Sequence, residues 1–92
     1  MKKLMLLLVA LFSVFPLTGQ DAQFYFEQGN VFFNEWEPVL AVEAFSKAIE
    51  LDPNNALYYI ARGDIYKEGL LDDDRAIEDY TSAIALDPNN PS

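Results

Sequence analysis

The sequence of 92 residues contains no histidine and no cysteine, and each absence removes a class of chemistry. Without these side chains the protein cannot form a histidine-activated nucleophile or a soft metal site. The lack of cysteine also excludes disulfide bonds and a lipid attached to a cysteine. We therefore predict no catalytic residue, no cofactor and no metal site, and we keep a hydrolase only as the last alternative.

Basic residues are also scarce. Six lysines and arginines stand against 15 aspartates and glutamates, so the net charge is −9. A protein that binds nucleic acid needs a basic surface that displaces the counterions of the phosphates. The acidic balance therefore argues against nucleic acid as a partner.

Long apolar runs are limited to residues 4–15, which follow Lys2 and Lys3 and are closed by Pro16 and Gly19. A basic start, a short apolar segment and small residues at its end are typical of a secretory signal peptide. The alternative is an uncleaved membrane anchor, but a span needs about 20 apolar residues. We predict that residues 1–19 are a cleaved signal peptide, and that the exported domain of residues 20–92 is periplasmic or secreted, without stable membrane insertion. Cleavage removes two lysines, so the net charge falls from −9 to −11.

The phrase LDPNN occurs at residues 51–55 and again at 86–90, and it belongs to a longer repeat. The positions that recur 34 residues later are Tyr25, Gly29 and Phe32, which return as Tyr59, Gly63 and Tyr66. Those that recur 35 residues later are Ala41, Phe45, Ala48, Leu51 and Pro53, which return as Ala76, Tyr80, Ala83, Leu86 and Pro88. The change of offset indicates one inserted residue between Tyr66 and Ala76, in a turn that contains Gly69 and three aspartates.

Each half of the repeat has the spacing of a helix. Tyr59, Gly63 and Tyr66 lie at i, i+4 and i+7, which places them on one helical face. Glycine on the first helix and alanine on the second let two backbones approach closely, so the unit is predicted to be an antiparallel helical hairpin. The second helix of each unit should end at the Asp–Pro step, and Asn54 or Asn55 should cap the next helix.

Three consecutive aspartates, Asp72 to Asp74, allow two interpretations. Clustered oxygens suit calcium, but the segment DDDRAIED lacks the alternating ligands, central glycine and distal glutamate of an EF-hand loop. Aspartates at this place also cap a helix and complement its dipole. We favour the capping role.

The order of aromatic, glycine, aromatic, alanine, aromatic, alanine and proline at a period of about 34 residues resembles the tetratricopeptide repeat. The resemblance covers residues 22–90, with repeat one at about 22–55 and repeat two at about 56–90. It implies an all-α fold, an α-solenoid of two helical hairpins with four antiparallel helices. Trp36 stands where a turn glycine is usual, and Gln28 and Arg62 replace the common leucine before the glycine.

The resemblance also implies a concave face, lined by the first helix of each hairpin, that binds a peptide or a partner protein. The positions that would face this partner are Gln23, Phe26, Asn30, Phe33, Asn34, Leu57, Ile60, Asp64, Lys67 and Glu68. The apolar members of this set can instead be buried by the adjacent hairpin or by a second copy of the chain. Asn30 matches one member of the family's clamp for C-terminal carboxylates, but its basic companion would fall at Phe26, so we reject that specificity.

The predicted function is thus an exported scaffold for protein interactions, and the partner is not identified by the sequence. The alternative is an incomplete fragment of a longer repeat array with no activity of its own. Only Pro91 and Ser92 follow the second LDPNN, too few for a further helix. The last helix should therefore expose Ile77, Ile84 and part of Tyr80, a strip that would be buried in a homodimer, buried against a partner or left by truncation of a longer parent. We predict self-association or low stability of the isolated mature chain.

Overall fold

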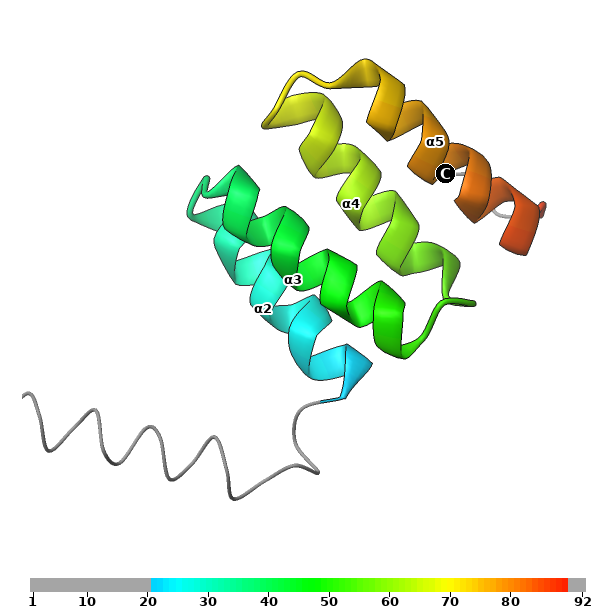
Figure 1. The fold of residues 1–92 in the computed structure, drawn as a ribbon, viewed down its shortest axis with the longest axis horizontal. Helices are drawn as coiled ribbons and strands as arrows, with labels where there is room; N and C mark the ends of the chain where they lie inside the picture. Colours follow the sequence, from blue (N-terminus) through cyan, green and yellow to red (C-terminus); the bar gives the residue numbers. More distant parts are fainter. Residues whose placement is uncertain (1–20, 90–92) are drawn as a thin grey trace, which may run out of the picture.

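The computed structural model describes residues 21–89, and in that range the chain forms four α-helices and no strand (Figure 1). They are α2 (Ala22–Asn34), α3 (Pro38–Leu51), α4 (Ala56–Glu68) and α5 (Asp73–Leu86). The all-α prediction is therefore confirmed. The predicted signal peptide, residues 1–19, lies outside the described residues.

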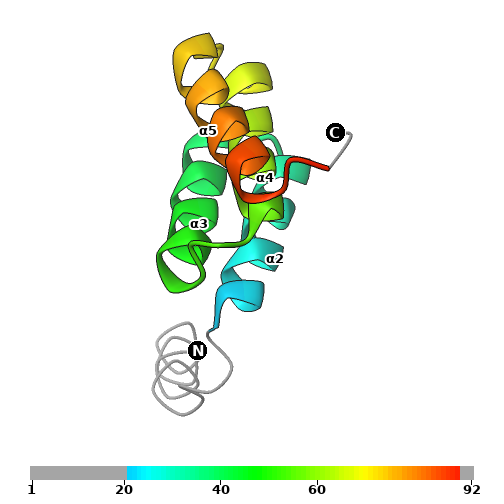
Figure 2. The same cartoon turned by 90° about the vertical axis from the view of Figure 1, so that its right-hand side faces the viewer.

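The helices pair as two hairpins, α2 with α3 and α4 with α5, and α4 packs against α3 to join them. Viewed from the end, α2 and α4 form one layer and α3 and α5 form the other (Figure 2). This arrangement confirms the predicted solenoid of two helical hairpins. The predicted partner-binding residues all belong to the layer of α2 and α4.

The ends of the helices follow from local capping chemistry. The side chains of Asp21, Asn55 and Asp72 accept hydrogen bonds from backbone N–H groups in the first turns of α2, α4 and α5, at 3.0 to 3.1 Å. Pro38 is the first residue of α3, where its missing N–H would have no helical partner. Helices α3 and α5 end at Leu51 and Leu86, each directly before an Asp–Pro step. The cap predicted at Asn54 or Asn55 is confirmed at Asn55, and the capping role of Asp72 and both Asp–Pro helix ends are confirmed as well.

Each hairpin closes where a glycine meets an aromatic ring. Gly29 lies against the ring of Phe45, and a Cβ added to Gly63 would come within 2.8 Å of the Tyr80 ring. Neither glycine has a positive φ, so these positions need glycine for the close approach and not for a special backbone conformation. The predicted packing of small residues against aromatic ones is confirmed in both hairpins.

The hydrophobic core lies across the junction between the hairpins. Ala41 and Phe45 of α3 and Ala61 and Ile65 of α4 are buried together there. Phe45 and Ile65 are the largest side chains that are fully buried in residues 21–89. The core therefore holds one hairpin to the other, as well as the two helices of each.

The turns inside the two hairpins place a non-glycine residue in the left-handed region, at Trp36 with φ 58° and at Leu71 with φ 54°. After α2, the N–H groups of Trp36 and Glu37 donate to the carbonyls of Phe33 and Phe32, which is a Schellman ending. The second turn spans residues 69–72 where the first spans 35–37, so the predicted insertion lies in the turn. The position that usually holds glycine thus carries tryptophan in the first turn, with the same backbone geometry.

Replacing Leu71 with glycine should stabilise the chain. Glycine adopts positive φ without the cost of roughly 1 kcal/mol that a Cβ imposes, and part of this gain is offset by the greater freedom of glycine in the unfolded chain. Leu71 is 81% exposed, so little packing is lost. We expect a net gain of about 0.5 kcal/mol in the free energy of unfolding, measured in urea.

Leu70→Gly is the matched control. Leu70 has no positive φ and is less exposed, at 38%, so glycine there should lower the free energy of unfolding. Equal losses in both variants would show that the left-handed turn is not strained.

Candidate partner-binding face

The ten residues predicted to face a partner lie on α2 and α4 at helical spacing, five on each helix. Five of them are exposed: Gln23, Asn34, Leu57, Lys67 and Glu68. The other five are half-buried: Phe26, Asn30, Phe33, Ile60 and Asp64. We refer to the ten together as the inner-face set.

Leu57 is the apolar member of the set with the greatest exposure, 52%. It lies in the first turn of α4, where its N–H is held by the Asn55 cap. Ile60 lies one helical turn further along and is half-buried. The start of α4 therefore presents an apolar surface on the layer that the sequence assigned to partner binding.

The phenylalanines of the set contribute to the core. The ring centroid of Phe26 lies 4.9 Å from that of Tyr58 and 5.8 Å from that of Phe45. Phe33 also packs against the core cluster, and its ring lies 6.2 Å from that of Trp36. Tyr58 belongs to α4, so Phe26 is covered in part by the adjacent hairpin, which is one of the two alternatives left open by the sequence.

Asp64 is held by a residue of α5. The Tyr80 hydroxyl donates a hydrogen bond of 2.5 Å to the Asp64 carboxylate. Burial raises the pKa of the Tyr80 phenol above its usual range, and the bond to Asp64 raises that pKa further, because it favours the protonated phenol. Part of the Asp64 carboxylate is thus occupied within the chain.

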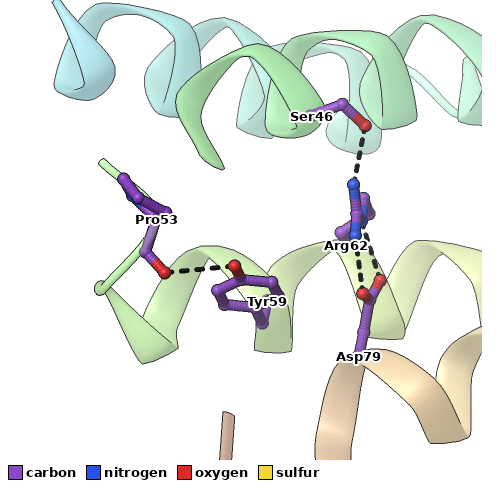
Figure 3. A network of polar contacts seen from close by, with 5 residues as sticks. All are labelled: Ser46, Pro53, Tyr59, Arg62 and Asp79. Carbon is purple, nitrogen blue, oxygen red and sulfur yellow. Dashed lines mark hydrogen bonds and ion pairs between the residues drawn. The ribbon is translucent and has the colours of Figure 1, made fainter. Parts of the chain in front are cut away.

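A polar network that the sequence analysis did not predict centres on Arg62 (Figure 3). Its Nε and Nη2 donate to the two oxygens of Asp79 at 2.8 and 2.7 Å, and its Nη1 donates to the Ser46 hydroxyl at 3.0 Å. The Asp79 side chain is only 5% exposed. Arg62 therefore connects α4 to both α3 and α5.

Aromatic rings surround the same guanidinium. Its carbon lies 6.0 Å from the centroid of Tyr59 and 5.9 Å from that of Tyr66, within the range of a cation–π contact. The hydrogen bonds that Arg62 donates to the Asp79 carboxylate raise the pKa of Arg62 further above its usual high value. The Tyr59 hydroxyl donates to the Pro53 carbonyl at 3.1 Å, which ties α4 to the loop that follows α3 (Figure 3).

A comparison within the sequence could have revealed this network. Arg62 and Asp79 stand at the positions that Gln28 and Ala44 occupy in the first hairpin, 34 and 35 residues earlier. Both members of the pair are charged in one hairpin and neutral in the other. A buried carboxylate needs a partner, so the joint change indicates a contact.

The acidic clusters and the helices of residues 21–89 bear on metal ligation and membrane insertion. Residues 21–89 contain no group of three or more acidic side chains placed to hold a metal ion. Asp72 caps α5, and Asp73 and Asp74 lie in its first turn, where their charge complements the helix dipole. None of the helices in this range is long and apolar enough to cross a membrane.

A groove of about 360 Å³ lies between α2 and α3 in the first hairpin. It is lined by Phe24, Tyr25, Gln28, Phe32, Leu40, Glu43, Ala44 and Lys47. We refer to it as the α2/α3 groove. No residue of the groove belongs to the inner-face set, so the groove is a second surface.

Two family models match the chain. A model described as a tetratricopeptide repeat matches residues 56–90, which contain α4 and α5. A model described as a TPR repeat matches residues 40–68, which contain most of α3 and all of α4. No curated protein sequence matches the chain.

Arg62→Gln should lower the free energy of unfolding by about 3 kcal/mol, because it leaves the buried Asp79 carboxylate without its charged partner. The double variant Arg62→Gln with Asp79→Ala copies the residues Gln28 and Ala44 of the first hairpin. It should recover most of the loss, since no buried charge remains. Urea unfolding of the three proteins measures both effects, and a double variant as unstable as the single one would contradict the assignment.

Tyr80 should make the stability depend on alkaline pH. Its folded pKa is raised above the ordinary value of about 10, so the folded chain holds this proton more tightly than the unfolded chain. The resulting stability is fully present below about pH 10 and is lost as the pH rises further. Urea unfolding at pH values on both sides of 10 should show a steeper decline in the wild type than in Tyr80→Phe.

Tyr58 also makes the free energy of unfolding depend on alkaline pH. Burial raises its pKa as well, so Tyr80→Phe should keep part of the decline. Parallel declines in the two proteins would show that Tyr80 does not contribute.

Proposed function

Because the chain belongs to the tetratricopeptide repeat family, we propose that it is a protein-interaction scaffold whose inner-face set on α2 and α4 binds an extended segment of a partner protein. Two models of the family together match residues 40–90. The role is non-enzymatic, in keeping with a sequence that has neither histidine nor cysteine.

The observation that carries the proposal is the exposure of Leu57. An isoleucine or leucine on the core side of these helices is buried, as Ile65 is, whereas Leu57 is 52% exposed beside the half-buried Ile60. Exposed polar side chains of the set, such as Asn34 and Lys67, lie further along the two helices. The set thus combines an apolar surface at the start of α4 with exposed polar groups toward the other ends of the two helices, and protein interfaces contain both kinds of residue.

Charge adds to the chemistry expected of the partner. All 15 acidic residues lie in residues 21–89, whereas two of the six basic residues are Lys2 and Lys3. Residues 21–89 thus carry a net negative charge, which favours the approach of cationic partners. We propose a partner segment that combines an apolar side chain for the Leu57 surface with net positive charge, and whose association slows as salt is added.

We also propose that this binding takes place after export, in the periplasm or outside the cell. This part of the proposal depends on the sequence of residues 1–19 alone, with its two lysines and its short apolar segment.

Partner capture tests the binding role. The chain is immobilised, proteins of the exported fraction are passed over it, and what it retains is identified by mass spectrometry. Leu57→Ser should reduce the retention of the specific partner by about tenfold, because one buried apolar side chain at an interface contributes roughly 1–3 kcal/mol. Helical circular dichroism should stay at the wild-type level.

Val39→Ser is the matched control. Val39 has nearly the same exposure, 59%, but lies at the start of α3 in the other layer. It should leave retention unchanged. Equal retention by Leu57→Ser and wild type, or equal loss in both variants, would contradict binding through the inner-face set.

A further inference from the structure

We propose that copies of this chain associate head to tail, with α5 of one copy docked into the α2/α3 groove of the next. The contact would repeat the one that α3 makes with the second hairpin inside the chain. The proposal does not depend on the partner-binding role, because it uses neither α4 nor the inner-face set.

The template is the internal contact between α3 and α4. On the α3 side, Val42 packs against the core cluster, Ser46 accepts a hydrogen bond from Arg62, and Ile49 is half-buried. On the α4 side, Arg62 points at α3 and Tyr59 bonds the loop that follows it. This contact joins the first hairpin to the second.

Helix α5 repeats the residues that α3 contributes to the α3–α4 contact. Thirty-five residues after Val42, Ser46 and Ile49 stand Ile77, Thr81 and Ile84. Ile77 is 60% exposed and Ile84 is 61% exposed, and Thr81 is exposed as well. The exposure predicted for Ile77 and Ile84 is therefore confirmed. Together with Thr81 they repeat, on the surface of α5, the residue types that α3 covers with α4.

The α2/α3 groove repeats the residues that α4 contributes to the α3–α4 contact. Thirty-four residues before Tyr59, Arg62 and Tyr66 stand Tyr25, Gln28 and Phe32, and all three line the groove. Phe24 and Leu40 add further apolar lining. The groove is thus the surface of the first hairpin that corresponds to the surface of α4 that packs against α3.

The polar residues at the proposed contact also match those at the α3–α4 contact. Inside the chain, Arg62 donates to Ser46. At the proposed contact Gln28 would face Thr81, a pair of an amide and a hydroxyl that form a hydrogen bond without a buried charge. Ala44 replaces the buried Asp79 on this side, so Gln28 needs no carboxylate behind it.

The arrangement has a distinct stoichiometry. The two docking surfaces lie on different parts of the chain, so the contact is heterologous and leaves one free surface at each end of a pair. Association would then continue beyond the dimer as concentration rises. A contact between two α5 strips would instead be isologous and stop at two copies.

A complementation experiment tests this difference. The chain is expressed from its full sequence, purified and studied by sedimentation across a concentration series. Ile84→Lys blocks the α5 strip, and Leu40→Lys, at a residue 41% exposed, blocks the groove. Each variant alone should associate about tenfold more weakly than the wild type or worse, because a lysine would be buried without a partner.

Mixing the two variants should restore association, but only to a one-to-one pair. One intact groove from Ile84→Lys and one intact α5 strip from Leu40→Lys remain, and no further copy can join. The two substitutions change the net charge equally, so electrostatic repulsion between copies affects the association of both variants to the same extent. Leu57→Ser should associate like the wild type, which separates this test from that of the inner-face set.

Several results would overturn the proposal. They are a wild type that is monomeric at every concentration, a Leu40→Lys variant that still associates, or a mixture no larger than either variant alone. Raising the ionic strength should strengthen wild-type association, because the net charge of −9 makes copies repel one another, and an opposite salt effect would count against an apolar contact.

Discussion

The packing of α4 against α3 is the contact on which the rest of the structure depends. Each hairpin is closed by a glycine that meets an aromatic ring, but the buried cluster that contains Phe45 and Ile65 lies between the hairpins. A unit of about 30 residues buries too little apolar surface to be stable alone, so neighbouring repeats must share a core. The shared core couples the unfolding of the two hairpins, and it explains why a small chain without disulfide bonds can hold four helices together.

Arg62 adds directional hydrogen bonds to this apolar contact. Its bonds to Ser46 and Asp79 link three helices, and they can form only when α4 has one rotation and one height relative to α3 and α5. A buried ion pair gives little net stability compared with neutral residues of similar size. The first hairpin, with Gln28 and Ala44 at the same positions, has no such pair. We infer that the pair serves mainly to select the register of α4, whose two neighbouring helices would otherwise allow sliding along apolar surfaces.

Most of the fold could be predicted because its signals are local or periodic. Pro38, Asn55 and the Asp–Pro steps define helix ends through short-range backbone chemistry, and the offsets of 34 and 35 residues placed the extra turn residue. The candidate site was harder, because the exposure of a side chain depends on how the hairpins meet. Phe26 and Leu57 were assigned the same role from their positions, yet one packs on Tyr58 and the other is half exposed. The bond between Asp64 and Tyr80 likewise depends on the distance between α4 and α5, which no spacing in the sequence specifies.

The two proposed surfaces are separate, but the geometry of the repeat would couple them. In the proposed contact, α5 of one copy docks into the α2/α3 groove of the next. Helix α2 of the second copy would then lie next to α4 of the first copy, in the same relation that α4 has to α2 within one chain. The layer of α2 and α4, which Figure 2 shows in one copy, would then continue into the next copy. A partner segment long enough to reach two copies would bind the second at a high effective concentration. By thermodynamic linkage, such a partner would strengthen head-to-tail association by the same factor by which association strengthens its own binding.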